Sequence, residues 1–337
     1  MALRVGICGY GFAGRFFHAP LLKGCGFDVA GIVTTNPDRA KDALADFPDS
    51  QIFSTVDALL QLKLDLLVVA SLNTAHANNA IAGLKAGVPV VVDKPMGRTV
   101  KETEQILGVS HETGIPVTTY FSRLFDSDTL TIKKILAEGT LGNVFRLDSR
   151  FEKFRPESNP ASWRENSSVA DGGGNLLDLG PHLVSIALDI FGPAELTYAS
   201  VRSIRGLADD DIVLNLRHES GVDSYLSASS IIGSGGPRIR LSGTKGSLVI
   251  KNLDPQEAIL LEGKYPVDAI WEISTRSNAL LSLGEEEIHY APEPGNYAQY
   301  YKAVEKAIAG TGSWPVSNSL ALDVAKIIEQ AREISVR

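Results

Sequence analysis

Residues 3–14 place three glycines directly after a short apolar run, and no other stretch narrows the possible folds so far. The run at residues 3–8 leads into GYGFAG at residues 9–14, and a helix-compatible segment follows. A strand that enters a tight glycine turn and then opens a helix leaves backbone N–H groups at the helix's positive end, where a pyrophosphate binds. Gly9 permits the turn, Gly11 lets the backbone approach the phosphates, and Gly14 allows close packing. The pattern favours dinucleotide binding over an ordinary strand-to-helix turn.

The first third of the chain alternates between strand and helix patterns. Apolar runs typical of buried strands occupy residues 3–8, 29–33, 64–70, 88–92 and 117–121. Helical patterns occupy residues 15–22, 37–47, 55–62, 74–86 and 100–113. Strands that alternate with helices predict a doubly wound parallel sheet with its ligand at the carboxyl ends of the strands. We therefore expect a Rossmann dinucleotide-binding domain over residues 1–121.

The remainder of the chain has a different pattern. Segments with period-2 alternation follow one another at residues 144–151, 196–204, 211–218, 223–230 and 238–242. Helical patterns occur at residues 129–139, 176–191 and 319–334. Short turns between successive strands predict a mainly antiparallel sheet. We expect an α+β domain over residues 122–337, and the last helix could pack against either domain.

Composition excludes several classes of function. The chain carries a net charge of −8 without a long block of like charge, so we expect neither nucleic acid nor a membrane surface as a partner. Its two cysteines cannot form a disulfide framework or a zinc site, and no metal is expected. The N-terminus has no signal-peptide pattern and no apolar run approaches twenty residues, which favours a cytoplasmic location.

The end of the second predicted strand bears on the choice of nucleotide. An NAD site of this type usually has Asp or Glu there to bind the ribose hydroxyls. This chain has Thr34, Thr35 and Asn36 instead, with Arg39 shortly after. Hydroxyl, amide and guanidinium groups suit a 2′-phosphate, which a carboxylate would repel. We therefore expect NADP, with NAD possible; the alternative is that Arg39 is a solvated helix residue.

Two further motifs contain residues suited to catalysis. Lys94 directly follows an apolar strand, where its ammonium could stabilise charge that develops on a substrate oxygen. Asp178 and His182 follow three glycines at a spacing of four, which places them on one face if the segment is a helix. A histidine positioned by a carboxylate can accept the proton of an alcohol near neutral pH. A solvated lysine, a capping aspartate and a core histidine are the alternatives.

These motifs, in this order, resemble the Gfo/Idh/MocA oxidoreductases over nearly the whole chain. The family's Glu-Lys-Pro motif, which supplies a catalytic lysine, is matched by Asp93-Lys94-Pro95, and its glycine-rich Asp-x-x-x-His segment by Asp178 and His182. Segments 17–22, 154–157, 162–165, 254–257 and 300–301 are similar to the branch that contains NADP-dependent scyllo-inositol dehydrogenases. The resemblance implies a Rossmann domain followed by an α/β domain with a large open sheet, through which members dimerise or tetramerise.

The resemblance and the motifs together give a set of candidate site residues. The catalytic candidates are Lys94, Asp178 and His182. The cofactor-binding candidates are Gly9, Tyr10, Gly11, Phe12, Ala13, Gly14, Thr34, Thr35, Asn36, Arg39, Ser71, Asn73, His76, Asp93 and Lys94. The substrate-binding candidates are Tyr120, Arg123, Arg155, Trp163 and Arg164.

Departures from the branch's pattern bear on the substrate. Residues 120–126 read YFSRLFD where the branch typically has YHNRRWD, and Ser185 stands where an aspartate is usual. Discrimination among polyols depends on such hydrogen-bonding partners, so inositol itself is in doubt. We expect oxidation of a secondary alcohol in a sugar, cyclitol or related polyol by a homodimer or homotetramer. The alternatives are a dehydrogenase of a non-sugar diol and a non-catalytic NADP-binding sensor.

Overall fold

The computed structural model describes residues 2–168, 171–206, 208–266, 271, 276 and 278–335, which form two compact units. The first unit contains Met1–Phe121 together with two later segments, Glu257–Trp271 and Tyr297–Leu322. The second unit contains Ser122–Gln256, Glu272–Asn296 and Asp323–Arg337. The chain thus passes from one unit to the other after residue 121, where the sequence pattern changes, but it returns twice to the first.

The first unit is built on a six-stranded parallel sheet, as the alternating pattern predicts. Its order, β3-β2-β1-β4-β5-β6, is that of a doubly wound dinucleotide-binding fold. The strands are β1 (Arg4–Cys8), β2 (Asp28–Val33), β3 (Gln51–Phe53), β4 (Leu66–Val69), β5 (Val90–Asp93) and β6 (Val117–Tyr120). All four residues of β4 and of β5 are buried, because helices cover both faces of such a sheet. Strand β3 was not predicted, since three residues carry no periodic signal.

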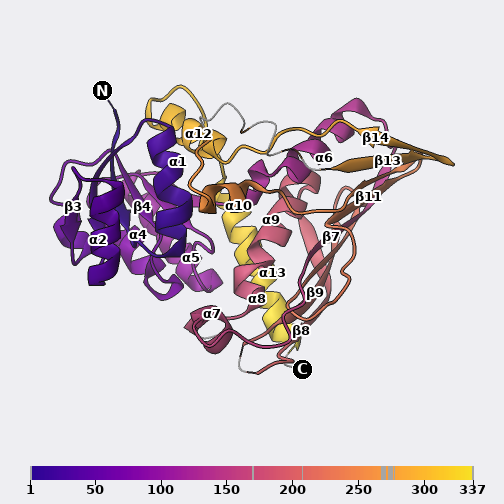
Figure 1. The fold of residues 1–337 in the computed structure, drawn as a ribbon, viewed down its shortest axis with the longest axis horizontal. Helices are drawn as coiled ribbons and strands as arrows, with labels where there is room; N and C mark the ends of the chain where they lie inside the picture. The colour runs from indigo at the N-terminus through magenta and orange to yellow at the C-terminus, as the bar shows by residue number, and fades with distance from the viewer. Residues whose placement is uncertain are drawn as a thin grey trace. The chain divides into compact units, whose positions relative to one another are not determined.

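Helices connect these strands and carry sequence-encoded caps. The helices of this unit include α1 (Ala19–Gly24), α2 (Pro37–Asp46), α3 (Val56–Leu59), α4 (His76–Lys85), α5 (Val100–Thr113) and α12 (Ala298–Ile308), with short turns η1 (Gly14–His18) and η2 (Asn73–Ala75) (Figure 1). The side chains of Asn36, Thr55 and Thr99 accept N–H groups in the first turns of α2, α3 and α5. Gly114 ends α5 in the left-handed conformation.

The helix after the glycine turn differs from the expected one. Helical backbone begins at Phe12 rather than at Arg15, and its turn η1 is a π-helix that leads directly into α1. Single π turns within helices are rare and are frequent at functional sites. This turn ends at His18, whose buried side chain reaches the end of β5.

The second unit contains an eight-stranded sheet of order β14-β13-β12-β11-β7-β10-β9-β8. Its strands are β7 (Val144–Glu152), β8 (Ala194–Arg202), β9 (Asp211–His218), β10 (Asp223–Ser229), β11 (Ile239–Gly243), β12 (Ser247–Ile250), β13 (Ala279–Leu283) and β14 (Glu286–Tyr290). Every neighbouring pair is antiparallel except β7 and β10. The prediction of a mainly antiparallel sheet is confirmed, although β12, β13 and β14 were not predicted.

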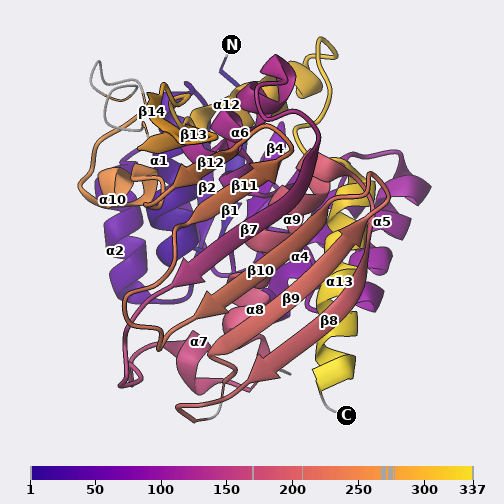
Figure 2. The ribbon, with the colours of Figure 1, turned by 90° about the vertical axis from the view of Figure 1, so that its right-hand side faces the viewer.

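Helices lie on one face of this sheet. Figure 2 shows α8 (Asn175–Asp178), α9 (Gly180–Phe191) and the final helix α13 (Asn318–Ser335) behind strands β8, β9 and β10. The unit also contains η3 (Ser122–Phe125), α6 (Ser127–Glu138) and α7 (Trp163–Asn166), and α10 (Gln256–Leu261) begins at its boundary. The side chains of Leu214, Leu226 and Leu241, one from each of three strands, are buried on the face that the helices cover and form part of the core.

The opposite face of the sheet carries tyrosines and charged side chains. Tyr198 and Tyr225 are 51% and 37% exposed, and the guanidinium of Arg146 lies 4.4 Å from the ring centroid of Tyr225. Asp148 forms ion pairs with Arg146 and Arg150 on the same face. No helix within the described ranges is long and apolar enough to cross a membrane.

Candidate active site

The glycine turn has the geometry that its three positions require. Gly9 has φ +101°, and a Cβ there would lie 2.6 Å from the Ala70 carbonyl oxygen. A Cβ on Gly14 would lie 2.1 Å from the carbonyl oxygen of Gly9, so helix and strand meet without room for a side chain. Gly11 is different, because a Cβ there would meet only the Arg39 guanidinium, at an ordinary contact distance of 3.6 Å. The backbone at Gly11 is thus open to a phosphate, with a cation beside it, and these residues fit a dinucleotide.

The start of α2 holds Arg39 near this turn. The Asn36 side chain accepts the Arg39 backbone N–H at 3.0 Å, and the Thr34 hydroxyl accepts the Asn36 N–H at 3.3 Å. Thr35, Asn36 and Arg39 are exposed. The sequence predicted their place at the end of β2, but it could not predict that the guanidinium would lie against Gly11.

The other turn residues differ in what they can offer a ligand. Tyr10 is buried and its hydroxyl donates to Asp46 at 2.9 Å, so its side chain is directed toward α2 and only its backbone belongs to the turn. Burial and this hydrogen bond raise the pKa of Tyr10 far above its usual value. Phe12 is 47% exposed and contacts the ring of Phe16, while Ala13 is half-buried.

Strand β5 ends in a buried carboxylate followed by a half-buried lysine. The Oδ1 of Asp93 lies 3.6 Å from the Nε2 of His18, and the Nδ1 of His18 lies 2.5 Å from the Tyr301 hydroxyl. Burial alone would raise the pKa of Asp93, but its interactions with His18, and then with Lys94 and His76, hold that pKa below its usual value. Lys94 follows directly and is joined to Pro95 by a cis peptide bond.

The ring nitrogens of His76 contact two backbone carbonyl groups, one of them in the same turn. Its Nδ1 lies 2.8 Å from the carbonyl oxygen of Pro95 and its Nε2 lies 3.1 Å from that of Ser71. The ring is fully buried, and burial lowers its pKa. These contacts connect two backbone segments, and the expected contact of His76 with a cofactor stays a prediction. Ser71 and Asn73 remain partly accessible, and the Ser71 hydroxyl accepts a hydrogen bond from Asn79 at 3.2 Å.

Two expected substrate residues are core residues of their units. Tyr120 is buried among aromatic rings, with centroids 4.5 Å from His18 and 4.8 Å from Tyr300. Arg123 is also buried, and its Nη1 lies 3.4 Å from the Asp126 carboxylate. Their roles as substrate residues stay predictions, and the structure places both side chains in buried surroundings.

Asp178 and His182 do not share one continuous helix as expected. Helix α8 ends at Asp178, and α9 begins at Gly180 after the turn residue Leu179. Pro181 lies in the first turn of α9, where its missing N–H costs nothing, so the sequence itself supports a new helix start. Asp178 Oδ1 pairs with Arg164 Nε at 3.1 Å, and His182 is 7% exposed.

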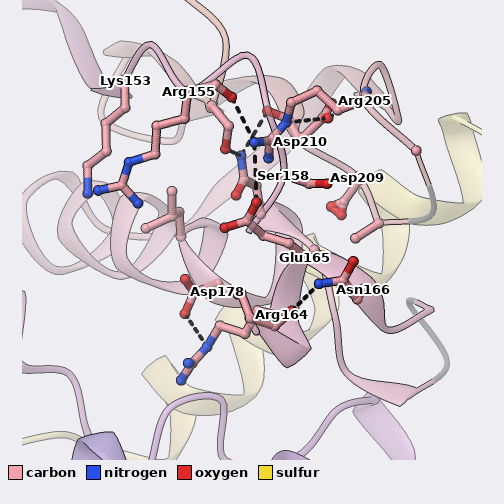
Figure 3. A pocket seen from close by; sticks show the side chains of 17 residues that line it. Lys153, Arg155, Ser158, Arg164, Glu165, Asn166, Asp178, Arg205, Asp209 and Asp210 are labelled. Carbon is pink, nitrogen blue, oxygen red and sulfur yellow. Dashed lines mark hydrogen bonds and ion pairs between the residues drawn. The ribbon is translucent and has the colours of Figure 1, made fainter. Parts of the chain in front are cut away.

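Asp178 lines a pocket of about 360 Å³ in the second unit (Figure 3). This volume is within the range of small-molecule sites. Arg155 and Arg164, two of the expected substrate residues, line it as well. Trp163, another expected substrate residue, has its ring centroid 4.8 Å from the guanidinium carbon of Arg164.

Acidic side chains of this pocket are matched by donors. Arg205 pairs with Glu165 at 3.2 Å and with Asp210 at 3.0 Å. Asp209 accepts the Leu176 N–H at 2.9 Å at the start of α8, and burial raises the pKa of Asp209 to about 6. Sequence reasoning did not find this network, since its members are far apart along the chain.

Sequence reasoning also missed the part that His18 takes at the end of β5. The segment at residues 17–22 and the tyrosine pair at 300–301 were noted only as points of resemblance. His18 contacts both Asp93 and Tyr301, which connects three separate motifs in one buried cluster. The available signal in the sequence was the presence of a histidine and of a tyrosine pair within these motifs.

Comparison with known proteins gives matches over both parts of the chain. A family model described as an oxidoreductase family with NAD-binding Rossmann fold matches residues 3–121, and the GFO/IDH/MocA C-terminal domain matches residues 129–249. The uncharacterized oxidoreductase YdgJ of Escherichia coli is 34% identical, covering 97% of this chain and 94% of its own length.

Two further relatives cover nearly the whole chain. The scyllo-inositol 2-dehydrogenase (NADP(+)) IolW of Bacillus subtilis is 30% identical, covering 99% of this chain and 94% of its own. The structure of a putative oxidoreductase from Yersinia pestis is similar with a TM-score of 0.90 at 33% identity, covering 99% of this chain and 95% of that one.

Proposed function

This chain belongs to the Gfo/Idh/MocA family of oxidoreductases, and from that premise we propose that it oxidises a secondary alcohol of a sugar, cyclitol or related polyol with NADP. The observation that supports this most strongly is the common edge of one parallel sheet. Strand β1 ends at the glycine turn and β5 ends at Asp93, directly before Lys94, and the carboxyl ends of parallel strands form the ligand-binding edge of this fold.

The residues of the first unit suit NADP better than NAD. The backbone of the glycine turn would hold the pyrophosphate, and Arg39 with Thr35 and Asn36 would hold the 2′-phosphate. When bound, the nicotinamide cofactor supplies the group that accepts a hydride from the alcohol or returns it to the ketone. A relative named as NADP-dependent supports the same choice.

Three side chains would carry the chemistry on the alcohol. The imidazole of His182 would take the hydroxyl proton, as suits a base that titrates near neutral pH. The Lys94 ammonium would donate a hydrogen bond to the same oxygen and stabilise its developing negative charge. Asp178, held by Arg164, would position the substrate in the pocket of the second unit.

A screen of alcohols tests this proposal directly. Full-length protein is mixed with NADP and a panel of sugars, cyclitols and linear polyols, and the absorbance of the reduced nicotinamide is followed. Turnover with at least one member is expected. Tight cofactor binding without turnover on any alcohol, non-sugar diols included, would instead indicate a sensor protein.

Replacement of Arg39 by alanine is expected to weaken NADP by about 10- to 100-fold and NAD hardly at all, since a hydrogen bond to a charged group is worth about 1.5–3 kcal/mol. Fluorescence titration with each cofactor measures both dissociation constants. Lys41→Ala, an exposed cation on the same helix, is the matched control. Equal losses for the two cofactors would rule out a phosphate contact.

We further propose that the open face of the second sheet joins copies of the chain into a homodimer or homotetramer. Tyrosine and arginine are enriched at protein interfaces, and this face presents Tyr198, Tyr225 and Arg146. Light scattering coupled to size exclusion is expected to give an oligomer, and a Tyr198→Glu/Tyr225→Glu variant a monomer. The control is Leu44→Glu, on an exposed apolar residue of α2. A monomeric wild type would end this proposal.

A further inference from the structure

Two cations of the Asp178 pocket have no acidic partner in the part of the chain that the structure describes. Lys153 and Arg155 both line it, and among the described residues neither side chain forms an ion pair or a hydrogen bond. They follow β7 in extended backbone, where alternate residues point to the same side, and Phe154 between them is exposed. Figure 3 shows their charged ends directed to the same side of the pocket.

The backbone that carries these two cations is fixed. The N–H of Lys153 donates to the Ser229 carbonyl at 2.9 Å and that of Arg155 to the Ser230 carbonyl at 2.7 Å. The Arg155 carbonyl accepts a hydrogen bond from Arg205 Nη1 at 2.8 Å. The positions at which the two side chains leave the chain are therefore set by the fold.

The remaining charges of the pocket do not neutralise this pair. Asp178 is paired with Arg164, and Glu165 and Asp210 with Arg205. Asp209 is buried at the start of α8 and accepts the Leu176 N–H. Two neighbouring positive charges without a counter-charge repel each other, and an anion bound between them would remove that cost.

We propose that Lys153 and Arg155 form a subsite for an anionic substituent of the substrate, a carboxylate or a phosphate. This inference deepens the proposed function and rests on it, since it narrows the substrate class to sugar acids, sugar phosphates or their cyclitol counterparts. Arginine binds two oxygens of such a group in a fixed plane, and lysine adds a mobile point charge. Because Asp178 lines the same pocket, the neutral part of the substrate would lie toward that residue.

Matched pairs of ligands test the subsite. Turnover with NADP is compared for glucose against glucuronate and glucose 6-phosphate, and for myo-inositol against inositol 1-phosphate. Either the carboxylate or the phosphate ligands are expected to have a higher kcat/KM than their neutral partners. The class with the higher value identifies the anion that the subsite binds. In a Lys153→Gln/Arg155→Gln variant this preference should fall by about 100-fold, from loss of two charge-assisted contacts.

A second readout separates this inference from the proposed chemistry. The same ligands are titrated by calorimetry into protein saturated with NADPH, which cannot accept a hydride from an alcohol. Anion binding that the double variant loses supports the subsite even if no alcohol is oxidised. A Lys85→Gln/Lys101→Gln variant removes the same charge from exposed helix positions and should bind normally.

Two results would overturn the subsite. The first is equal kcat/KM for neutral and anionic partners while alcohol oxidation itself proceeds, which leaves the proposed function standing. The second is equal anion binding by the wild type, the pocket variant and the helix control, which would show a general charge effect.

Discussion

Replacing Lys94 by alanine is expected to lower kcat by about 10²–10³, the usual cost of removing one donor to a developing oxyanion. Cofactor affinity should hardly change, because the pyrophosphate and 2′-phosphate would bind at the glycine turn and at Arg39. Turnover is followed by nicotinamide absorbance and binding by fluorescence titration. Lys94→Arg keeps the charge but changes its geometry, and it should recover only part of the activity.

His182→Ala should reduce kcat by about 10²–10⁴, since it removes the proposed general base. If Lys94 and His182 act on the same oxygen in one step, the double variant should lose little more than the worse single variant. Added neutral imidazole should partly restore His182→Ala and leave Lys94→Ala unchanged. Near-normal kcat in both single variants would remove these residues from the catalytic account, whereas multiplicative losses would place them in separate steps.

Much of the first unit could be predicted because its strands are buried on both faces. Runs such as residues 66–69 and 90–92 are continuously apolar, and turn signals separate them from helices, so each strand can be predicted from its own residues. Strand β3 has only three residues and its place at the sheet edge depends on β2. Strands β12 to β14 of the second sheet were missed for a similar reason, since they are only four or five residues long and such short strands take their structure from pairing with neighbours.

The candidate site was predictable where a motif is local and not where contacts span the chain. The glycine turn and Lys94 follow from neighbouring residues. The helix break at Leu179 is indicated by Pro181, which favours a new helix start. The spacing of Asp178 and His182 favours one continuous helix instead, and that expectation was wrong. The approach of Arg39 to Gly11 requires the register of two strands and a helix, which no local pattern contains.

Replacing His18 by leucine is expected to lower the free energy of unfolding by about 1–3 kcal/mol at pH 7.5, the usual cost of leaving a buried polar group without its partner. Asp93 would then lose the imidazole that faces it, whose other neighbours are Tyr120 and Tyr301. Adding Asp93→Asn in the same chain should recover part of the loss, because no buried charge would remain. Urea denaturation measures the midpoint shift for each variant.

The pH dependence of this loss separates charge from packing. In the wild type the folded pKa of Asp93 lies below its unfolded value, so its contribution to stability is present above about pH 4 and is lost as pH falls through the folded pKa. Without His18 we expect burial to dominate and raise the folded pKa. The difference in the free energy of unfolding between wild type and His18→Leu should therefore decrease as pH falls through that raised pKa. Below it, only the loss of packing should remain.

Tyr301→Phe provides the matched control, since it removes the hydroxyl that contacts His18 and keeps the ring. It should cost only about 1 kcal/mol, independent of pH between 5 and 7.5. A gap between wild type and His18→Leu that stays constant over that range would show that His18 contributes packing and no charge compensation. Because Lys94 directly follows Asp93, the His18→Leu/Asp93→Asn chain should remain slow in turnover even where its stability recovers, which would place the buried pair among the groups that position Lys94.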